Sequence, residues 1–237
     1  MTDSFTLPNS DDLDSVYYIA NQCILHGEYD LASRITTFGE ANFPGKFRLC
    51  SGAGARIPAK STDPVSTIIR ATDILMDKDE VKLALDICVF SRSLYPNDID
   101  LMYACADLYI CNNTDDDCLK LLIHLESLID TGSDLVDACG AHSIYAKLSL
   151  YWLYKQDISR TLQYIDLALG VNTPYKYYTH ACLHFTRYQI LKKDRFYWGL
   201  THDMDSAWDI IQILKKEEGF IDYEGLEKAI IGFRGKS

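Results

Sequence analysis

The sequence contains few basic residues and no long hydrophobic run. Its 23 Lys and Arg residues are outnumbered by 34 Asp and Glu residues, which gives a formal net charge of -11 at pH 7. General nucleic-acid binding depends on cations that neutralise phosphates, so this balance makes a nucleic-acid partner a poor expectation. No run of about 18 uncharged apolar residues occurs, so we expect no helix that spans a membrane and no membrane partner.

The N-terminal sequence, MTDS, also lacks the basic stretch and apolar core of a secretory signal. We therefore expect a cytoplasmic protein. The eight cysteines agree with a reducing compartment, because several of them occupy core positions of a helical pattern, where a free thiol behaves as a small hydrophobe. These are Cys23, Cys88, Cys105 and Cys118, and we expect all eight cysteines to be reduced.

Helical hairpins are the main feature that the sequence does contain. From Ala84, small residues recur at Cys88 and Ser91, which is the spacing of one face of an α-helix. Pro96 ends this helix because proline cannot continue it, and Asp98 supplies a cap for the next apolar helix. The segment therefore predicts one helix followed, after a short turn, by another.

This pattern recurs at a constant interval. The small residue at Ala84 returns 34 residues later as Cys118, and Ala32 is followed by Pro44 at the same 12-residue distance that separates Ala84 from its proline. Four units match in this way over about residues 13–173. The interval and the packing positions resemble the tetratricopeptide repeat, a helical hairpin of about 34 residues. Because the matching positions are packing positions, the resemblance bears mainly on the fold.

The resemblance implies an all-α fold: a right-handed α-solenoid of antiparallel helix pairs, with about four to five hairpins and a C-terminal capping helix. We expect residues 1–12 to form a flexible tail and residues 13–237 to form a single repeat domain. The distance from Ala32 to Ala84 is 52 residues, 18 more than one repeat of 34, so an insertion loop is expected at about 45–63.

Local signals set the expected helix bounds. Gly27 suits the left-handed conformation at a helix end, and Asp63-Pro64 is an N-cap followed by proline at the first helical position. Thr173-Pro174 repeats this start, and Gly170 is the expected C-cap of the preceding helix. The expected helices are 13–26, 29–42, 64–76, 79–95, 98–111, 115–130, 135–154, 158–169, 175–192, 205–216 and 222–233.

In the tetratricopeptide family the first helix of each hairpin lines a concave inner groove, and the corresponding residues here are tyrosine-rich and acidic. The resemblance implies these partner-binding residues: Tyr17, Asn21, Arg70, Asp73, Asp77, Asp100, Tyr103, Asp107, Lys147, Leu150 and Tyr154. Such a groove suits another protein with a basic segment, because tyrosine offers contact area and carboxylates attract cations. The acids could equally be a solvated face. The carboxylate clamp of chaperone-binding relatives is not implied, since Tyr17 stands where the clamp needs Lys.

We therefore expect a non-catalytic scaffold or auxiliary subunit that needs no cofactor. An alternative from another class is an enzyme or ligand sensor. His180 and His184 have the i, i+4 spacing of metal ligands, with His202 or Asp203 as a third ligand. The 45–63 loop nearly contains a phosphate-binding motif at 54–61, although Pro58 removes one of the N–H groups that such a motif needs.

Overall fold

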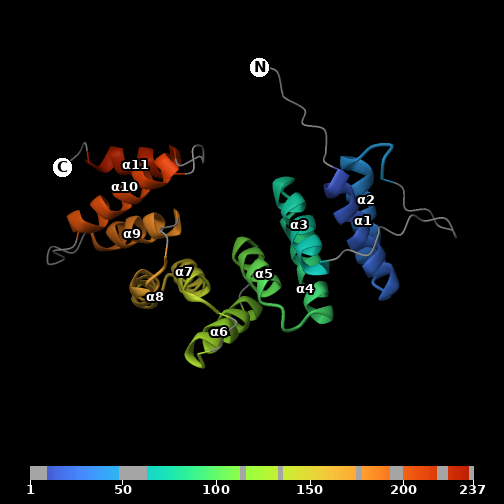
Figure 1. Cartoon of the computed structure of the whole chain (residues 1–237), viewed down its shortest axis with the longest axis horizontal. Helices are drawn as coiled ribbons and strands as arrows, with labels where there is room; N and C mark the ends of the chain where they lie inside the picture. The colour runs from blue at the N-terminus through green and yellow to red at the C-terminus, as the bar shows by residue number, and fades with distance from the viewer. Residues whose placement is uncertain are drawn as a thin grey trace, which may run out of the picture. The chain divides into compact units, whose positions relative to one another are not determined.

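The computed structural model describes residues 10–47, 63–112, 116–132, 136–174, 178–192, 200–217 and 224–234. All regular structure within these ranges is α-helical, which confirms the predicted all-α class. The described helices, shown in Figure 1, are α1 (Ser10–Leu25), α2 (Tyr29–Asn42), α3 (Pro64–Asp77), α4 (Val81–Leu94), α5 (Ile99–Cys111), α6 (Asp116–Asp130), α7 (Ala138–Tyr154), α8 (Ile158–Gly170), α9 (Tyr178–Leu191), α10 (Leu200–Glu217) and α11 (Glu224–Arg234). None of them has the length and apolar character needed to cross a bilayer.

The predicted caps and turns of the first half are confirmed. The Asp63 side chain accepts a hydrogen bond from the Ser66 backbone N–H at 3.1 Å, and Pro64 is the first residue of α3. Asp98 accepts from the backbone N–H of Leu101 at 3.0 Å. Gly27 has φ +82°, the left-handed conformation that glycine adopts without steric cost. Short-range signals therefore set these helix ends.

The first helix begins earlier than the sequence predicted. It starts at Ser10, so residues 10–12 of the predicted tail are helical. Asp12 lies in the first turn, where a carboxylate stabilises the positive end of the helix dipole. It also accepts hydrogen bonds from Arg70 of α3 at 2.8 and 3.0 Å. This contact fixes the N-terminal turn, and residues 1–9 of the predicted tail lie outside the described residues.

Three helix ends in the second half also differ from the prediction. Helix α7 begins at Ala138 with Asp137 as its N-cap, so the predicted start at residue 135 is wrong. Gly170 is the last residue of α8, and Val171 is the C-cap. Helix α10 begins at Leu200, five residues before the predicted start, because its first turns carry side chains that are buried against α9.

The chain divides into two compact units, which are described separately: residues up to Cys118 and residues from Leu119 onward. In the first unit, α1 packs against α2 and α3 against α4, while α1 contacts α3, α3 contacts α5 and α2 contacts α4. Equivalent helices of successive pairs are thus neighbours. Ala20, Ala84 and Cys88 are fully buried, and their small side chains let the helix backbones approach one another.

An aromatic contact joins α1, α2 and the residues that follow α2. The ring of Phe47 is buried so close to Gly39 of α2 that a Cβ on Gly39 would lie 2.6 Å from the ring carbons. The same ring stacks on Tyr17 of α1, with centroids 4.2 Å apart. The Tyr17 hydroxyl donates to the carbonyl oxygen of Lys46 at 3.0 Å. The residues just after α2 are therefore part of the core.

In the second unit, α7 packs against α8 and α9 against α10. Ala146, Ile165, Ala168 and Leu183 form a core shared by α7, α8 and α9. A second core lies among α9, α10 and α11, to which α11 contributes Leu226 and Ile230. The predicted capping helix thus has a buried apolar face against the rest of its unit.

Candidate functional site

A cavity of about 390 Å³ lies in the first unit, between α3 and α5. Apolar and polar residues share its lining, which consists of Ile69, Thr72, Asp73, Met76, Asp100, Ala104, Asp107 and Leu108. Its volume falls in the range of about 300–1,000 Å³ that is usual for ligand pockets. The cavity therefore offers both apolar contact and negative charge to a ligand.

Helical spacing brings these residues together. Four of them lie on α3, at positions 69, 72, 73 and 76, and the other four lie on α5, at 100, 104, 107 and 108. Residues three, four, seven and eight positions apart share one side of a helix, so each helix presents one continuous face. Asp73 and Asp107 are 34 residues apart and occupy equivalent places in neighbouring repeats. The repeat interval therefore places one carboxylate at the same position of each helix, and α5 adds a second one, Asp100.

The carboxylate of Asp73 is in an unfavourable electrostatic position. Partial desolvation raises its pKa above the usual aspartate value, and the negative charge of Asp77, one turn along α3, raises the pKa further. Arg70 of the same helix is engaged elsewhere in the unit, because its guanidinium donates to Asp12 of α1. The charge that acts on Asp73 is thus another carboxylate.

The other polar group in the lining has a backbone partner. The Thr72 hydroxyl donates to the Ile69 carbonyl oxygen at 2.7 Å within α3. The hydroxyl hydrogen is therefore used by the helix itself. The charged groups of the lining are the carboxylates of Asp73, Asp100 and Asp107, and all three residues are exposed.

The predicted groove residues of the first unit are placed in different ways. Asp73, Asp100 and Asp107 line the cavity, and Asp77 acts on it through its charge. Tyr17 packs against Phe47, as described above. Asn21 and Tyr103 are half-buried on α1 and α5. The prediction of a tyrosine lining therefore has no counterpart among the residues that line this cavity.

Sequence reasoning missed part of the lining. Thr72, Met76, Ala104 and Leu108 also face the cavity. The signal was present, since Met76 lies seven residues after Ile69 and Leu108 lies four after Ala104, which is the spacing of one helix face.

Three predicted groove residues belong to α7, in the second unit. The Lys147 ammonium group donates to the Ser143 hydroxyl at 3.3 Å. Leu150 is 43% exposed and Tyr154 is 63% exposed. They present apolar and aromatic surface to solvent on one side of α7.

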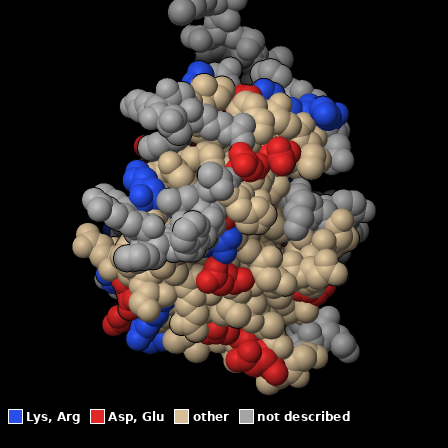
Figure 2. All heavy atoms as spheres, turned by 90° about the vertical axis from the view of Figure 1, so that its left-hand side faces the viewer, with Lys and Arg blue, Asp and Glu red and all other residues tan. Residues whose placement is uncertain are grey.

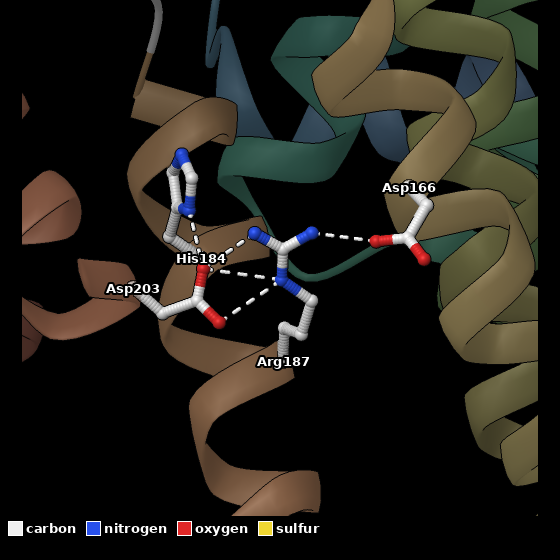
Figure 3. Close-up of polar contacts among 4 residues, drawn as sticks. All are labelled: Asp166, His184, Arg187 and Asp203. Carbon is white, nitrogen blue, oxygen red and sulfur yellow. Dashed lines mark hydrogen bonds and ion pairs between the residues drawn. The ribbon is translucent and has the colours of Figure 1, made fainter. Parts of the chain in front are cut away.

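Polar side chains of α8, α9 and α10 form a hydrogen-bonded network in the second unit, as Figure 3 shows. Asp203 of α10 is completely buried and accepts hydrogen bonds from Arg187 of α9, whose Nε lies 3.1 and 3.0 Å from the two carboxylate oxygens. His184 donates from Nδ1 to the same carboxylate at 2.9 Å. Arg187 also donates to Asp166 of α8 at 2.5 Å. One guanidinium therefore joins three helices.

The two histidines with metal-ligand spacing have separate surroundings. The His180 ring stacks on the His142 ring of α7 with centroids 3.8 Å apart, and its Nε2 lies 3.3 Å from the Thr173 hydroxyl. His184 instead faces Asp203. Within the described ranges, no group of three or more potential ligands has a geometry that could hold a metal ion. The phosphate-loop-like residues 54–61 lie outside those ranges.

Two of the buried cysteines, Cys23 and Cys88, have thiols with raised pKa values. All seven cysteines that the structure describes have free thiols. A hydrogen bond with Cys105 raises the pKa of the Cys88 thiol, and burial raises it further. Burial raises the pKa of Cys23 to about 12. Nucleophilic cysteines need a lowered pKa, so these thiols are packing groups.

Surface charge is dispersed on the face shown in Figure 2. Asp and Glu side chains lie in separate groups among uncharged residues, with Lys and Arg side chains between them. This is the pattern expected if most of the acid excess serves solubility. The carboxylates of the cavity differ because they adjoin apolar side chains in a concave site.

No protein-family model, curated protein or solved structure matches this chain. Its likeness to the tetratricopeptide repeat remains a prediction from the sequence spacing.

Proposed function

We propose that this protein is a non-catalytic interaction module, a scaffold or auxiliary subunit, that binds a segment of another protein in the cavity between α3 and α5. The proposal includes a right-handed solenoid of tetratricopeptide-like hairpins. The successive contacts from α1 to α3 and from α3 to α5 support it, because stacked hairpins place equivalent helices side by side.

The cavity itself is the observation that carries the proposal. Its lining combines apolar side chains with three carboxylates, which is suited to an amphipathic cation. The excess of negative charge over the whole chain would attract a basic segment and increase its rate of association. A binding role explains why carboxylates and apolar side chains lie together in a cavity. If the acids were only a solvated face, no cavity would be needed.

A non-catalytic role fits the chemistry of the lining. Acyl or phosphoryl transfer would need a nucleophile activated by a base, or an electrophile that stabilises developing negative charge. The Thr72 hydroxyl is committed to the Ile69 carbonyl, and the remaining polar side chains of the lining are acids. These acids would oppose negative charge and favour positive charge.

The test is affinity purification from native lysate with quantitative mass spectrometry. Asp107→Lys reverses a charge in the cavity, and Glu40→Lys makes the same change on an exposed position of α2 outside it. We expect the Asp107 variant to lose a partner that the wild type and the Glu40 variant retain. An unchanged set of partners in all three samples contradicts the proposal.

A further inference from the structure

The cavity lining is divided into two chemical kinds. Ile69, Met76, Ala104 and Leu108 provide apolar surface, while Asp73 and Asp107 provide negative charge from the two facing helices. A lysine or arginine side chain has the same division, because its methylene stem buries against apolar surface while its charged head keeps polar partners. An acidic or purely apolar side chain would match only one part of the lining or neither.

The free protein bears a cost that such a side chain would relieve. Partial desolvation and the charge of Asp77 both make the ionised form of Asp73 less favourable, as its raised pKa shows. Arg70, on the same helix, forms an ion pair with Asp12 of α1. A cation from a partner would supply the opposite charge that Asp73 lacks in its immediate electrostatic surroundings.

We infer that the α3–α5 cavity binds the side chain of one lysine or arginine of the partner, with its methylenes against Ile69, Met76 and Leu108 and its charged head between Asp73 and Asp107. This inference rests on the proposed function and specifies the residue class that anchors the partner. Lysine and arginine share the required chemistry, and the experiment distinguishes them.

The probes are Nα-acetyl-lysine methylamide, the corresponding arginine compound and the norleucine compound, which keeps the apolar stem without the charge. Each is titrated into the full chain while backbone amide signals are followed by ¹⁵N NMR at constant ionic strength. We expect lysine, arginine or both to shift signals within 69–76 and 100–108. The favoured basic probe should bind more tightly than norleucine by about two- to fivefold for each carboxylate that it contacts.

Two variants test the assignment of the carboxylates. Asp73→Asn with Asp107→Asn keeps the shape of the lining and removes the two charges assigned to the head group, while Asp100 stays in place. We expect this variant to lose most of the preference for the basic probes over norleucine. Glu40→Gln is the matched control, because it removes a charge outside the cavity and should leave the titration unchanged. Both proteins are first compared with the wild type by circular dichroism to establish that they are folded.

Equal binding of norleucine and the basic probes would overturn the inference, as would basic probes that shift only signals outside the cavity or shift none. The proposed function would survive these outcomes if the Asp107→Lys variant still lost a specific partner. Conversely, lysine binding in the cavity with no change of partners would support the preference of the cavity for a basic side chain and contradict the proposed function.

Discussion

The two units place charges of opposite sign beside their buried or crowded carboxylates. Asp203 in the second unit is completely removed from solvent, and the chain surrounds it with Arg187 and His184. Asp73 in the first unit lies at a cavity, where the neighbouring charge is that of Asp77. The first arrangement compensates a charge within the fold, and the second presents negative charge to whatever enters the cavity.

This difference separates structural charges from candidate binding charges. A buried carboxylate without its cation would be strongly unfavourable, so the Asp203 network is required for the packing of its helices. A carboxylate at the cavity can remain ionised because water still reaches it, although at some cost in free energy. The position of the compensating cation is therefore more informative about function than the presence of the acid.

The largest expected effect is in the second unit. Arg187→Met removes the cation from the buried Asp203 carboxylate and should lower the free energy of unfolding by about 3–5 kcal/mol. Chemical denaturation measures this loss. Lys192→Met, at the exposed residue that directly follows α9, is the control, with an expected change within about 0.5 kcal/mol. Similar stabilities of the two variants would mean that the buried ion pair is not structurally required.

The second effect tests whether the first unit depends on packing more than on internal charge pairs. Gly39→Ala would force the Phe47 ring away from α2, and overpacking of this kind usually costs about 1–3 kcal/mol. Gly170→Ala is the control, because its Cβ would meet nothing within 4 Å and alanine favours the helix. In thermal unfolding, we expect Gly39→Ala to lower the Tm and Gly170→Ala to raise it. An unaffected Gly39→Ala protein would contradict the close contact.

The third effect is smaller, and its change in stability has the opposite sign to that of Arg187→Met. Asp73→Asn removes a carboxylate repelled by Asp77 and should leave stability unchanged or raise it by less than about 0.5 kcal/mol, since solvent screens exposed charges. The same variant should bind the basic probe more weakly. A clear loss of stability on this substitution would show that Asp73 is compensated within the fold.

The smallest effect is in the pH dependence, where Asp73 differs from Glu227. The pKa of Asp73 is higher in the folded protein than the usual aspartate value of about 4. Its contribution to stability is therefore present below about pH 4 and is lost as the pH rises through the pKa of the folded protein. Glu227 accepts hydrogen bonds from Lys215, which lower its pKa, so its contribution is lost instead as pH falls. Carboxyl ¹³C NMR should show Asp73 titrating above, and Glu227 below, their usual ranges. Titration of both groups at their usual values would remove the electrostatic contrast.

Much of the helical pattern could be predicted from residues close in sequence. Asp63 and Asp98 cap the helices that they were expected to cap, and Gly27 adopts the expected left-handed turn. Helix spacing also predicted that Asp73 and Asp107 would occupy equivalent positions. These features depend on a few neighbouring residues or on a constant repeat interval, which sequence alone displays.

Contacts between distant residues could not be predicted in the same way. The start of α10 was missed because Asp203 becomes helical and buried through its contact with Arg187, 16 residues earlier. His180 and His184 have identical spacing in sequence to a ligand pair, yet one stacks on His142 and the other faces Asp203. The identity of a side chain shows which interactions it can make, but not which distant residue it contacts.

The sequence by itself determined that this chain is helical, where many helices are capped, and that acids recur on the first helices of successive repeats, because propensity, capping and periodicity are local. Only the tertiary structure decided that Phe47 fills the space beside Gly39, that Arg187 compensates Asp203, and that Asp73 shares a cavity with Asp107. These outcomes depend on which helix faces meet, and that is set by the combined packing of side chains far apart in the chain.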